Sequence, residues 1–340
     1  MTNKLLIVAP AWVGDMVMAH SLLRLLRQTR PNCIIDVLAP DATRSLLARM
    51  PEVRRAIPLP FSHGQLALKQ RYALACSLRT EKYDQAILLS NTFKSALMPF
   101  WAQIPIRTGW HGEMRWGVLN DRRRLDKQKY PLMIQRFCAL AFPPNTDLPD
   151  PLPSPILTSS SVIATASLRG GQQSRPLLAL CPGAEYGPAK RWPPAYYAEV
   201  ANACLAQDWE VCLMGSRGDQ VAAAEIQNLT DNRCTDLVGK TSLLEAIDRL
   251  AVADAVISND SGLMHIAAAL QRPLVVIYGS TDPRFTPPLT ENVSILSLKL
   301  PCSPCFQREC PLGHLKCLRD LMPAQVLEAL DTIYMYKVQI

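Results

Sequence analysis

The chain has 340 residues, of which 49% are apolar and 19% are charged. It is too long for one small core and too apolar for intrinsic disorder, so we expect a compact protein of about two domains. The most apolar windows are either shorter than the ~20 residues of a bilayer crossing or interrupted by Arg272. No leader with a small-residue cleavage pattern is visible, which favours a cytoplasmic protein.

The charge is distributed unevenly along the chain. Residues 1–150 hold 21 Lys and Arg against 11 Asp and Glu, whereas residues 151–340 hold 15 against 18. A basic half is typical of a protein that meets an acidic partner, and a solvated surface without a specific partner is an equally good reading of the charge alone.

The eleven cysteines form two groups. Seven are scattered singly among apolar residues, as in a reducing compartment: Cys33, Cys76, Cys138, Cys181, Cys204, Cys212 and Cys234. The other four have the spacing C-x2-C-x4-C-x6-C: Cys302, Cys305, Cys310 and Cys317. That spacing suits a tetrahedral zinc site, but it is not a standard finger or ribbon, so free structural thiols are the favoured alternative.

Strand and helix patterns alternate in both halves of the chain. Strands are predicted at residues 4–9, 34–38, 85–89, 177–181, 210–214, 255–258 and 274–278, and helices at 16–28, 196–205, 243–250, 264–270 and 324–336. Alternation of this kind predicts parallel sheets covered by helices, and a single large sheet is the alternative. The proline-rich segment 142–155 predicts a linker, which gives domains at 1–150 and 151–322 and a terminal helix within 323–340.

Three loops that lead from a strand into a helix carry distinctive residues. Gly14 and Asp15 follow the first strand, where a helix start keeps a carboxylate ionised. A loop of small residues over 181–193 ends in the cations Lys190 and Arg191, and residues 258–265 place small residues at a helix start, where anions bind. Each pattern alone is weak, since first-turn acids are often only capping devices.

Together, these motifs resemble those of the ADP-heptose glycosyltransferases. Gly14-Asp15, Lys190-Arg191-Trp192-Pro193 and the run at 259–269 (NDSGLMHIAAA) match the family in order and spacing over nearly the whole chain. The cysteine-containing stretch at 301–314 resembles the branch of the family that adds the second heptose.

The resemblance implies an α/β fold of the GT-B type, with two facing Rossmann-like doubly wound domains and a C-terminal helix that crosses back to the first domain. It implies that L-glycero-D-manno-heptose passes from ADP-heptose to the first heptose of heptosyl-Kdo2-lipid A, with inversion, in synthesis of the lipopolysaccharide inner core. The acceptor is expected on the first domain and the donor on the second. We expect no cofactor, no metal and no nucleic acid, and a monomer that is cytoplasmic and peripheral to the inner membrane.

Roles for single residues follow from the same resemblance. Asp15 is expected to be the general base and Lys190 to neutralise the departing diphosphate. The donor-binding candidates are Gly183, Ala184, Lys190, Arg191, Gly215, Ser216, Asp260, Ser261, Gly262 and His265. The acceptor-binding candidates are Gly14, Lys94, Arg115, Arg122, Arg123 and Arg124. Glu185 and Tyr186 depart from the family pattern, since some relatives place hydroxyl residues there.

Two other functions are compatible with parts of the sequence. The same fold could epimerise a nucleotide sugar, which needs no lipid acceptor. A different kind of function, with no catalysis, is a basic nucleic-acid-binding module with a zinc element. The basic half lacks aromatic residues interleaved with its cations, and the four clustered cysteines lie in the other half, which argues against that module.

Overall fold

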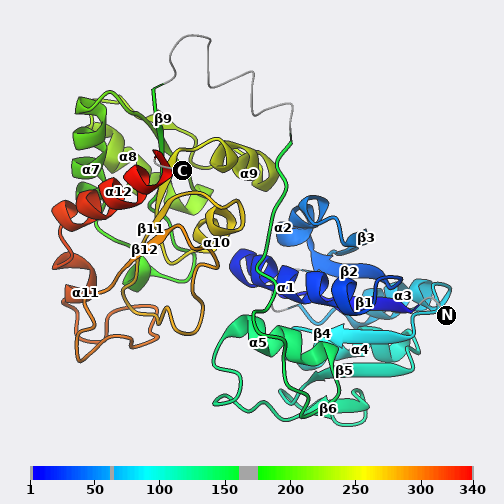
Figure 1. Cartoon of the computed structure of the whole chain (residues 1–340). Coiled ribbons are helices and arrows are strands. Elements are labelled where there is room, and N and C mark those ends of the chain that lie inside the picture. The colour runs from blue at the N-terminus through cyan, green and yellow to red at the C-terminus, as the bar shows by residue number, and fades with distance from the viewer. Residues whose placement is uncertain (1–2, 62–64, 161–174, 339–340) are drawn as a thin grey trace. The chain divides into compact units, whose positions relative to one another are not determined.

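The computed structural model describes residues 3–61, 65–160 and 175–338 (Figure 1). Contacts divide the chain into two compact units, Met1–Pro155 and Ile156–Ile340. Each unit contains one six-stranded sheet, and the neighbouring strands of both sheets run parallel. The α/β prediction with two doubly wound sheets is therefore confirmed, and the single-sheet alternative is wrong.

The first sheet has the strand order β3-β2-β1-β4-β5-β6. Its strands are β1 (Lys4–Val8), β2 (Ile34–Pro40), β3 (Val53–Leu59), β4 (Gln85–Leu88), β5 (Ile106–Trp110) and β6 (Asp121–Arg123). Its helices are α1 (Val13–Thr29), α2 (Asp41–Arg44), α3 (Leu68–Arg79), α4 (Phe93–Trp101) and α5 (Met133–Cys138), with 3-10 turns at Ser45–Arg49 and Ala139–Ala141. Four of the five residues of β1 are buried, as expected for an inner parallel strand covered on both faces.

The second sheet has the strand order β12-β11-β10-β7-β8-β9. Its strands are β7 (Leu177–Cys181), β8 (Glu210–Leu213), β9 (Thr235–Asp236), β10 (Ala255–Asn259), β11 (Leu274–Ile277) and β12 (Val293–Leu296). Its helices are α7 (Pro194–Ala206), α8 (Gln220–Leu229), α9 (Leu243–Ala251), α10 (Gly262–Ala269), α11 (Lys316–Arg319) and α12 (Pro323–Val338), with 3-10 turns at Pro188–Lys190 and Arg217–Asp219. When the strands of each unit are counted from its first strand, the two sheets share the same order.

The C-terminal helix α12 packs in the second unit over residues 326–333, and the expectation that it crosses back to the first domain stays a prediction. Four of its side chains lie in the hydrophobic core of the second unit: Val326, Ala329, Leu330 and Ile333. The same helix contacts α7, β11 and β12. Burial of this apolar stripe against the second sheet holds α12, through Ile333, in the second unit.

Candidate functional site

In each sheet there is one point at which successive strands stop being added on one side of the first strand and are added on the other side. In the first unit the reversal lies between β1 and β4, and in the second between β7 and β10. Ligands of open parallel sheets bind beyond the carboxyl ends of the strands at such a switch point. The loops that follow these four strands span residues 9–12, 89–92, 182–193 and 260–261, and most of the predicted site residues lie in or next to them.

Lys190 and Asp260 form an ion pair at the second switch point. The Lys190 Nζ atom lies 2.5 Å from Asp260 Oδ2, and Thr281 Oγ1 donates to the same oxygen at 2.5 Å. Asp260 is 4% exposed, whereas the Lys190 side chain is 14% exposed. The buried carboxylate is thus satisfied by a cation and a hydroxyl, and the ammonium group retains some access to solvent. Sequence reasoning missed Thr281, because only tertiary folding brings it to Asp260.

Asn259, at the end of β10, fixes the loop that carries Lys190. Its Oδ1 atom accepts hydrogen bonds from Trp192 N and Tyr197 Oη, both at 3.1 Å, and its Nδ2 atom donates to Pro182 O at 2.7 Å. Asn259 and Trp192 are 0% and 1% exposed. Buried polar groups with all partners in place rigidify their surroundings, so Asn259 acts as a positioning residue for the loop.

Ser261 and Gly262 form the start of α10, directly after Asp260. Ser261 occupies the N-cap position, and its side chain makes no capping bond, although Ser258 Oγ lies 3.2 Å from Ser261 Oγ. The first N–H groups of a helix have no partner within the helix, and they favour an anion. The helix start therefore provides donors for a phosphate next to the Lys190 ammonium group.

His265 lies one turn into α10 and is 5% exposed. Its pKa is lowered to about 4, mainly by burial; the Asp260 carboxylate opposes the shift and the nearby Lys190 ammonium group adds to it. The imidazole is therefore neutral at pH 7. Its role in donor binding stays a prediction, and a neutral imidazole would supply no positive charge to a phosphate.

Several of the residues predicted to bind the sugar-nucleotide donor surround the carboxylate of Asp219. Ser216 donates to Asp219 Oδ2 through its backbone N at 2.9 Å and through its Oγ at 2.8 Å, and Arg191 Nη2 lies 3.9 Å from Asp219 Oδ1. A Cβ atom on Gly183 would lie 2.3 Å from this carboxylate, and one on Gly215 would lie 3.1 Å from it. The two glycines therefore make room for Asp219, which sequence reasoning did not single out.

The loop at 183–191 is braced by the cysteine-containing segment. Tyr186 Oη donates to Phe306 O at 2.6 Å, and Ala189 N donates to Arg308 O at 3.0 Å. The ring of Tyr186 also has the Lys190 ammonium group 5.1 Å from its centroid. The departure from the family pattern at Tyr186 thus has a local function, since this residue ties the loop to residues 302–310. Ala184, in the same loop, is buried and accepts from Arg191 Nε at 3.1 Å.

The four clustered cysteines are partly buried and not bonded to one another. Within residues 3–61, 65–160 and 175–338, no group of three or more His, Cys, Asp or Glu side chains is arranged to hold a metal ion. Backbone N–H groups around the Cys310 thiol lower its pKa, with Leu315 contributing most, whereas burial raises the pKa of Cys317.

Gly14 and Asp15 lie in the first turn of α1, at the switch point of the first sheet. The helix begins at Val13, three residues before the predicted start, so Gly14 is a helical residue rather than a turn residue. Asp15 is half-buried. A carboxylate in this turn is stabilised in its ionised form by the helix dipole, which suits a base.

Arg115, one of the acceptor-binding candidates, lies inside the first unit rather than at its surface. Its side chain is 1% exposed and donates to Ser90 O at 2.9 Å, to Asn91 Oδ1 at 3.2 Å and to Trp110 O. Burial lowers its pKa. Arg115 instead ties the loop after β5 to the loop after β4, because its guanidinium satisfies the free oxygens of both.

The remaining acceptor candidates divide by position. Arg123 is also internal, since it pairs with Asp121 at 2.6 Å and donates to Ala139 O and Phe142 O. Arg122 and Arg124, the neighbours of Arg123 in the sequence, are exposed, in agreement with the alternation of side chains along extended backbone. Lys94 is half-buried. It is the second residue of α4, the helix that follows the loop after β4.

The described helices include none with the length and apolarity of a membrane span.

The sequence profile of glycosyltransferase family 9 (heptosyltransferase) matches residues 71–316. Lipopolysaccharide heptosyltransferase 2 of Salmonella typhimurium is 45% identical over 97% of this chain and 98% of that protein, and lipooligosaccharide heptosyltransferase 2 of Haemophilus ducreyi is 44% identical over 97% and 99%. The structure of E. coli ADP-heptose lipopolysaccharide heptosyltransferase II has a TM-score of 0.88 and 42% identity, and the match covers 98% of this chain and 99% of that one. The resemblance stated from the sequence is confirmed: the chain belongs to glycosyltransferase family 9, the heptosyltransferase family.

Proposed function

We propose that this protein transfers L-glycero-D-manno-heptose from ADP-heptose to the first heptose of heptosyl-Kdo2-lipid A, with inversion, in synthesis of the lipopolysaccharide inner core. The observation that carries the proposal is the full-length similarity to proteins named heptosyltransferase 2, in a chain whose Lys190 ammonium group pairs with Asp260 directly before the start of α10. It acts as a monomer, cytoplasmic and peripheral to the inner membrane.

The donor diphosphate binds at Lys190 and at the start of α10. Negative charge on the ADP oxygens grows as the bond to the anomeric carbon breaks, and preorganised donors aimed at such charge are effective catalysts. Because Lys190 already pairs with Asp260, the diphosphate shares the ammonium group with this carboxylate. Thr281 keeps Asp260 hydrogen-bonded during the exchange. The neutral His265 contributes packing and hydrogen bonding rather than charge.

The acceptor binds to the first unit, where Asp15 serves as the general base. Asp15 takes the proton of the acceptor hydroxyl as that oxygen attacks the anomeric carbon on the face opposite ADP, which inverts the configuration. One carboxylate suffices, because ADP departs as an anion and needs charge stabilisation more than a proton. Lys94, Arg122 and Arg124 bind the phosphates and carboxylates of the acceptor, and Gly14 leaves space beside the base.

The direct test is incubation with ADP-heptose and heptosyl-Kdo2-lipid A, followed by mass analysis of the lipid. We expect a mass increase of one heptose and the release of one ADP per transfer. A lipid that is unchanged while the donor sugar changes configuration would instead identify an epimerase. The same reaction with an acceptor that lacks the first heptose should give no product.

A further inference from the structure

The loop at residues 111–118, between β5 and the edge strand β6 of the first sheet (Figure 1), exposes two large apolar side chains. Met114 is 80% exposed and Trp116 is 65% exposed, more than any other large apolar side chain described in the first unit. No role at the reaction centre was assigned to either residue. Large apolar side chains that are exposed near one another and bordered by polar residues are typical of interaction surfaces.

The support under these side chains is rigid. Arg115, between them in sequence, is buried and anchors the loop to Ser90, Asn91 and Trp110. Glu113 accepts from Phe93 N at 2.6 Å, and its own backbone N donates to Asn91 O at 3.3 Å. The loop therefore holds its apolar side chains outward by buried polar contacts, and their exposure is a property of the fold.

The charges around the loop are predominantly positive. The Arg122 guanidinium lies 3.8 Å from the centroid of the Trp116 ring, and Arg124 is exposed two residues further along the chain. The nearby carboxylates are already engaged: Glu113 by Phe93 N, Asp121 by Arg123, and Asp126 by the N–H groups of residues 128 and 129. The exposed surface thus combines an indole, a thioether and two unneutralised guanidinium groups.

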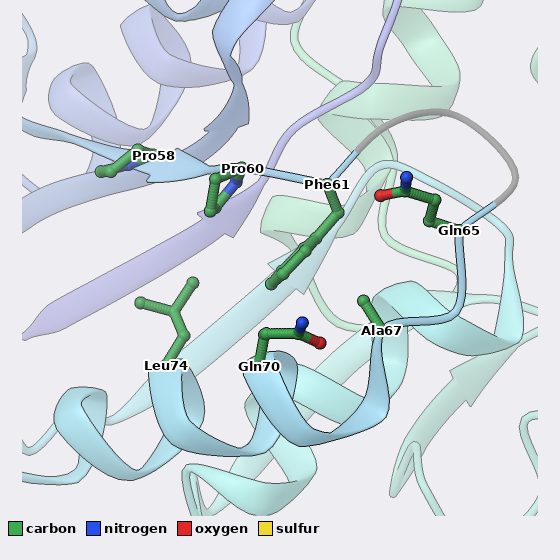
Figure 2. Close-up of a pocket in the computed structure, with 7 residues that line it drawn as sticks. All are labelled: Pro58, Pro60, Phe61, Gln65, Ala67, Gln70 and Leu74. Carbon is green, nitrogen blue, oxygen red and sulfur yellow. The ribbon is translucent and has the colours of Figure 1, made fainter.

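The exposed 111–118 loop is separate from the pocket drawn in Figure 2. An open pocket of the first unit lies elsewhere, after β3, where Pro58, Pro60, Phe61 and Leu74 line it together with polar residues (Figure 2). No residue of the 111–118 loop lines that pocket. Tryptophan and arginine side by side are characteristic of proteins that sit at the boundary between lipid headgroups and acyl chains.

We propose that loop 111–118 docks the protein onto the surface of an anionic phospholipid bilayer. Met114 and Trp116 enter the boundary between headgroups and acyl chains, and Arg122 and Arg124, which the proposed function also places against the acceptor, contact the phosphates of the bilayer lipids around it. The inference rests on the proposed function, because an acceptor with a lipid anchor must be reached at a membrane. It adds the residues that bring the enzyme to that surface.

Co-sedimentation with vesicles of phosphatidylglycerol and phosphatidylethanolamine tests the docking. Met114→Ser with Trp116→Ser should weaken binding of the full chain by about tenfold or more. The matched control is Leu66→Ser with Leu68→Ser, which removes two other exposed apolar side chains of the same unit and should leave binding unchanged. Arg122→Gln with Arg124→Gln should weaken binding by about fivefold per cation, and only when phosphatidylglycerol is present. Met114→Asp, at the most exposed site, replaces the double variant if the latter fails to fold.

Kinetics separate membrane docking from direct acceptor recognition. With the acceptor embedded in vesicles, Met114→Ser with Trp116→Ser should raise the acceptor KM about tenfold. With a water-soluble, acyl-free acceptor the same variant should match the parent protein. Unchanged vesicle binding, or an equal loss with the soluble acceptor, would overturn the proposal; the second outcome would make the loop a sugar-binding subsite. Absence of transfer by the parent protein to the soluble acceptor would instead refute the proposed function, and vesicle binding would still report on the loop.

Discussion

Lys190 contributes both to the stability of the second unit, through its pair with Asp260, and to the proposed catalysis. Removing Lys190 leaves a carboxylate that is 4% exposed and has lost its cation, although Thr281 still donates a hydrogen bond to it. We expect Lys190→Ala to raise the donor KM, to lower kcat, and to reduce kcat/KM by about 10²-fold or more, because the cation faces charge that is present in the bound diphosphate and grows as it leaves. The melting temperature should also fall, since a buried charge loses its partner.

A matched variant separates the two effects of this substitution. Lys240 pairs with Asp236 at 2.6 Å in the same unit, but its side chain is 58% exposed. Lys240→Ala removes a lysine–aspartate pair at the surface, which contributes little to stability. We expect its steady-state constants and melting temperature to match the parent protein, so a similar loss in both variants would contradict the role of Lys190.

Asp15 should leave a different kinetic trace. Asp15→Asn keeps the shape of the side chain and removes the base, so kcat should fall by ~10²- to 10⁴-fold while ADP affinity stays nearly constant. Asp41→Asn, in the first turn of α2, is the control for a helix-start acid in the same unit and should retain full activity. Near-normal kcat in a folded Asp15→Asn protein would make Asp15 only a helix-start residue.

His265 links the donor site to the pH dependence of stability. Its pKa is about 4 in the folded chain against an ordinary value of 6.5. Between these values the unfolded chain binds a proton that the folded chain does not, so stability is lost as the pH falls from about 6.5 towards 4, by up to ~3 kcal/mol. Denaturant titrations should show a shallower loss in His265→Gln, with the exposed His111→Gln as control. Equal slopes in all three proteins would exclude a buried, neutral His265.

At the scale of elements, Gly187 joins two segments of the donor site. Its φ angle of +152° is disfavoured for side-chain-bearing residues, and a Cβ atom there would lie 2.6 Å from Arg308 O. Gly187→Ala should therefore separate the 183–191 loop from residues 302–310, with a loss of about 2 kcal/mol or more and a weaker affinity for ADP. Gly218→Ala meets only ordinary contacts at 3.5 Å and is the control. Calorimetric binding of ADP and thermal melting measure both effects, and equal values for the two variants would exclude this bracing role.

The sequence predicted the inner elements better than the edge elements. β1 and β7 are continuous apolar runs because a parallel sheet buries both faces, so their pattern is visible without the structure. β6 and β9 are short polar strands, Asp-Arg-Arg and Thr-Asp, that exist only because a neighbouring strand pairs with them. No hydrophobic period could have indicated them, which is why neither strand is among the predicted elements.

Site residues in a loop that follows an inner strand could be predicted from the sequence. Site residues that meet only because separate segments fold together could not. Lys190 and Asp260 follow inner strands, and the resemblance placed both in the donor site. The positioning role of Asn259, and the places of Asp219 and Thr281 in the site, became visible only when the fold brought them to distant partners. Arg115 and Arg122 were indistinguishable as sequence, because one guanidinium is internal and the other exposed for reasons of loop packing and strand alternation.

For the whole molecule, the charge asymmetry between the two halves leads to a prediction about salt. Residues 1–150 carry an excess of ten positive charges, and surface charges are screened over about 8 Å at physiological ionic strength. With a soluble, acyl-free acceptor, we expect its KM to rise with salt while the donor KM changes less. Lys94, Arg122 and Arg124 carry the effect, because Arg115 and Arg123 are internal.

Charge reversal to glutamate at these three positions should raise the acceptor KM by about tenfold or more at low salt and flatten its dependence on salt, with the donor KM unchanged. The control reverses three other cations of the first unit, Arg44, Lys69 and Lys82, which alters the net charge equally. If net charge alone mattered, the acceptor KM would rise equally in both triple variants. A local acceptor-binding surface raises it only in the first. An acceptor KM that stays at the parent value in Lys94→Glu with Arg122→Glu and Arg124→Glu would show that the basic half meets the acceptor elsewhere.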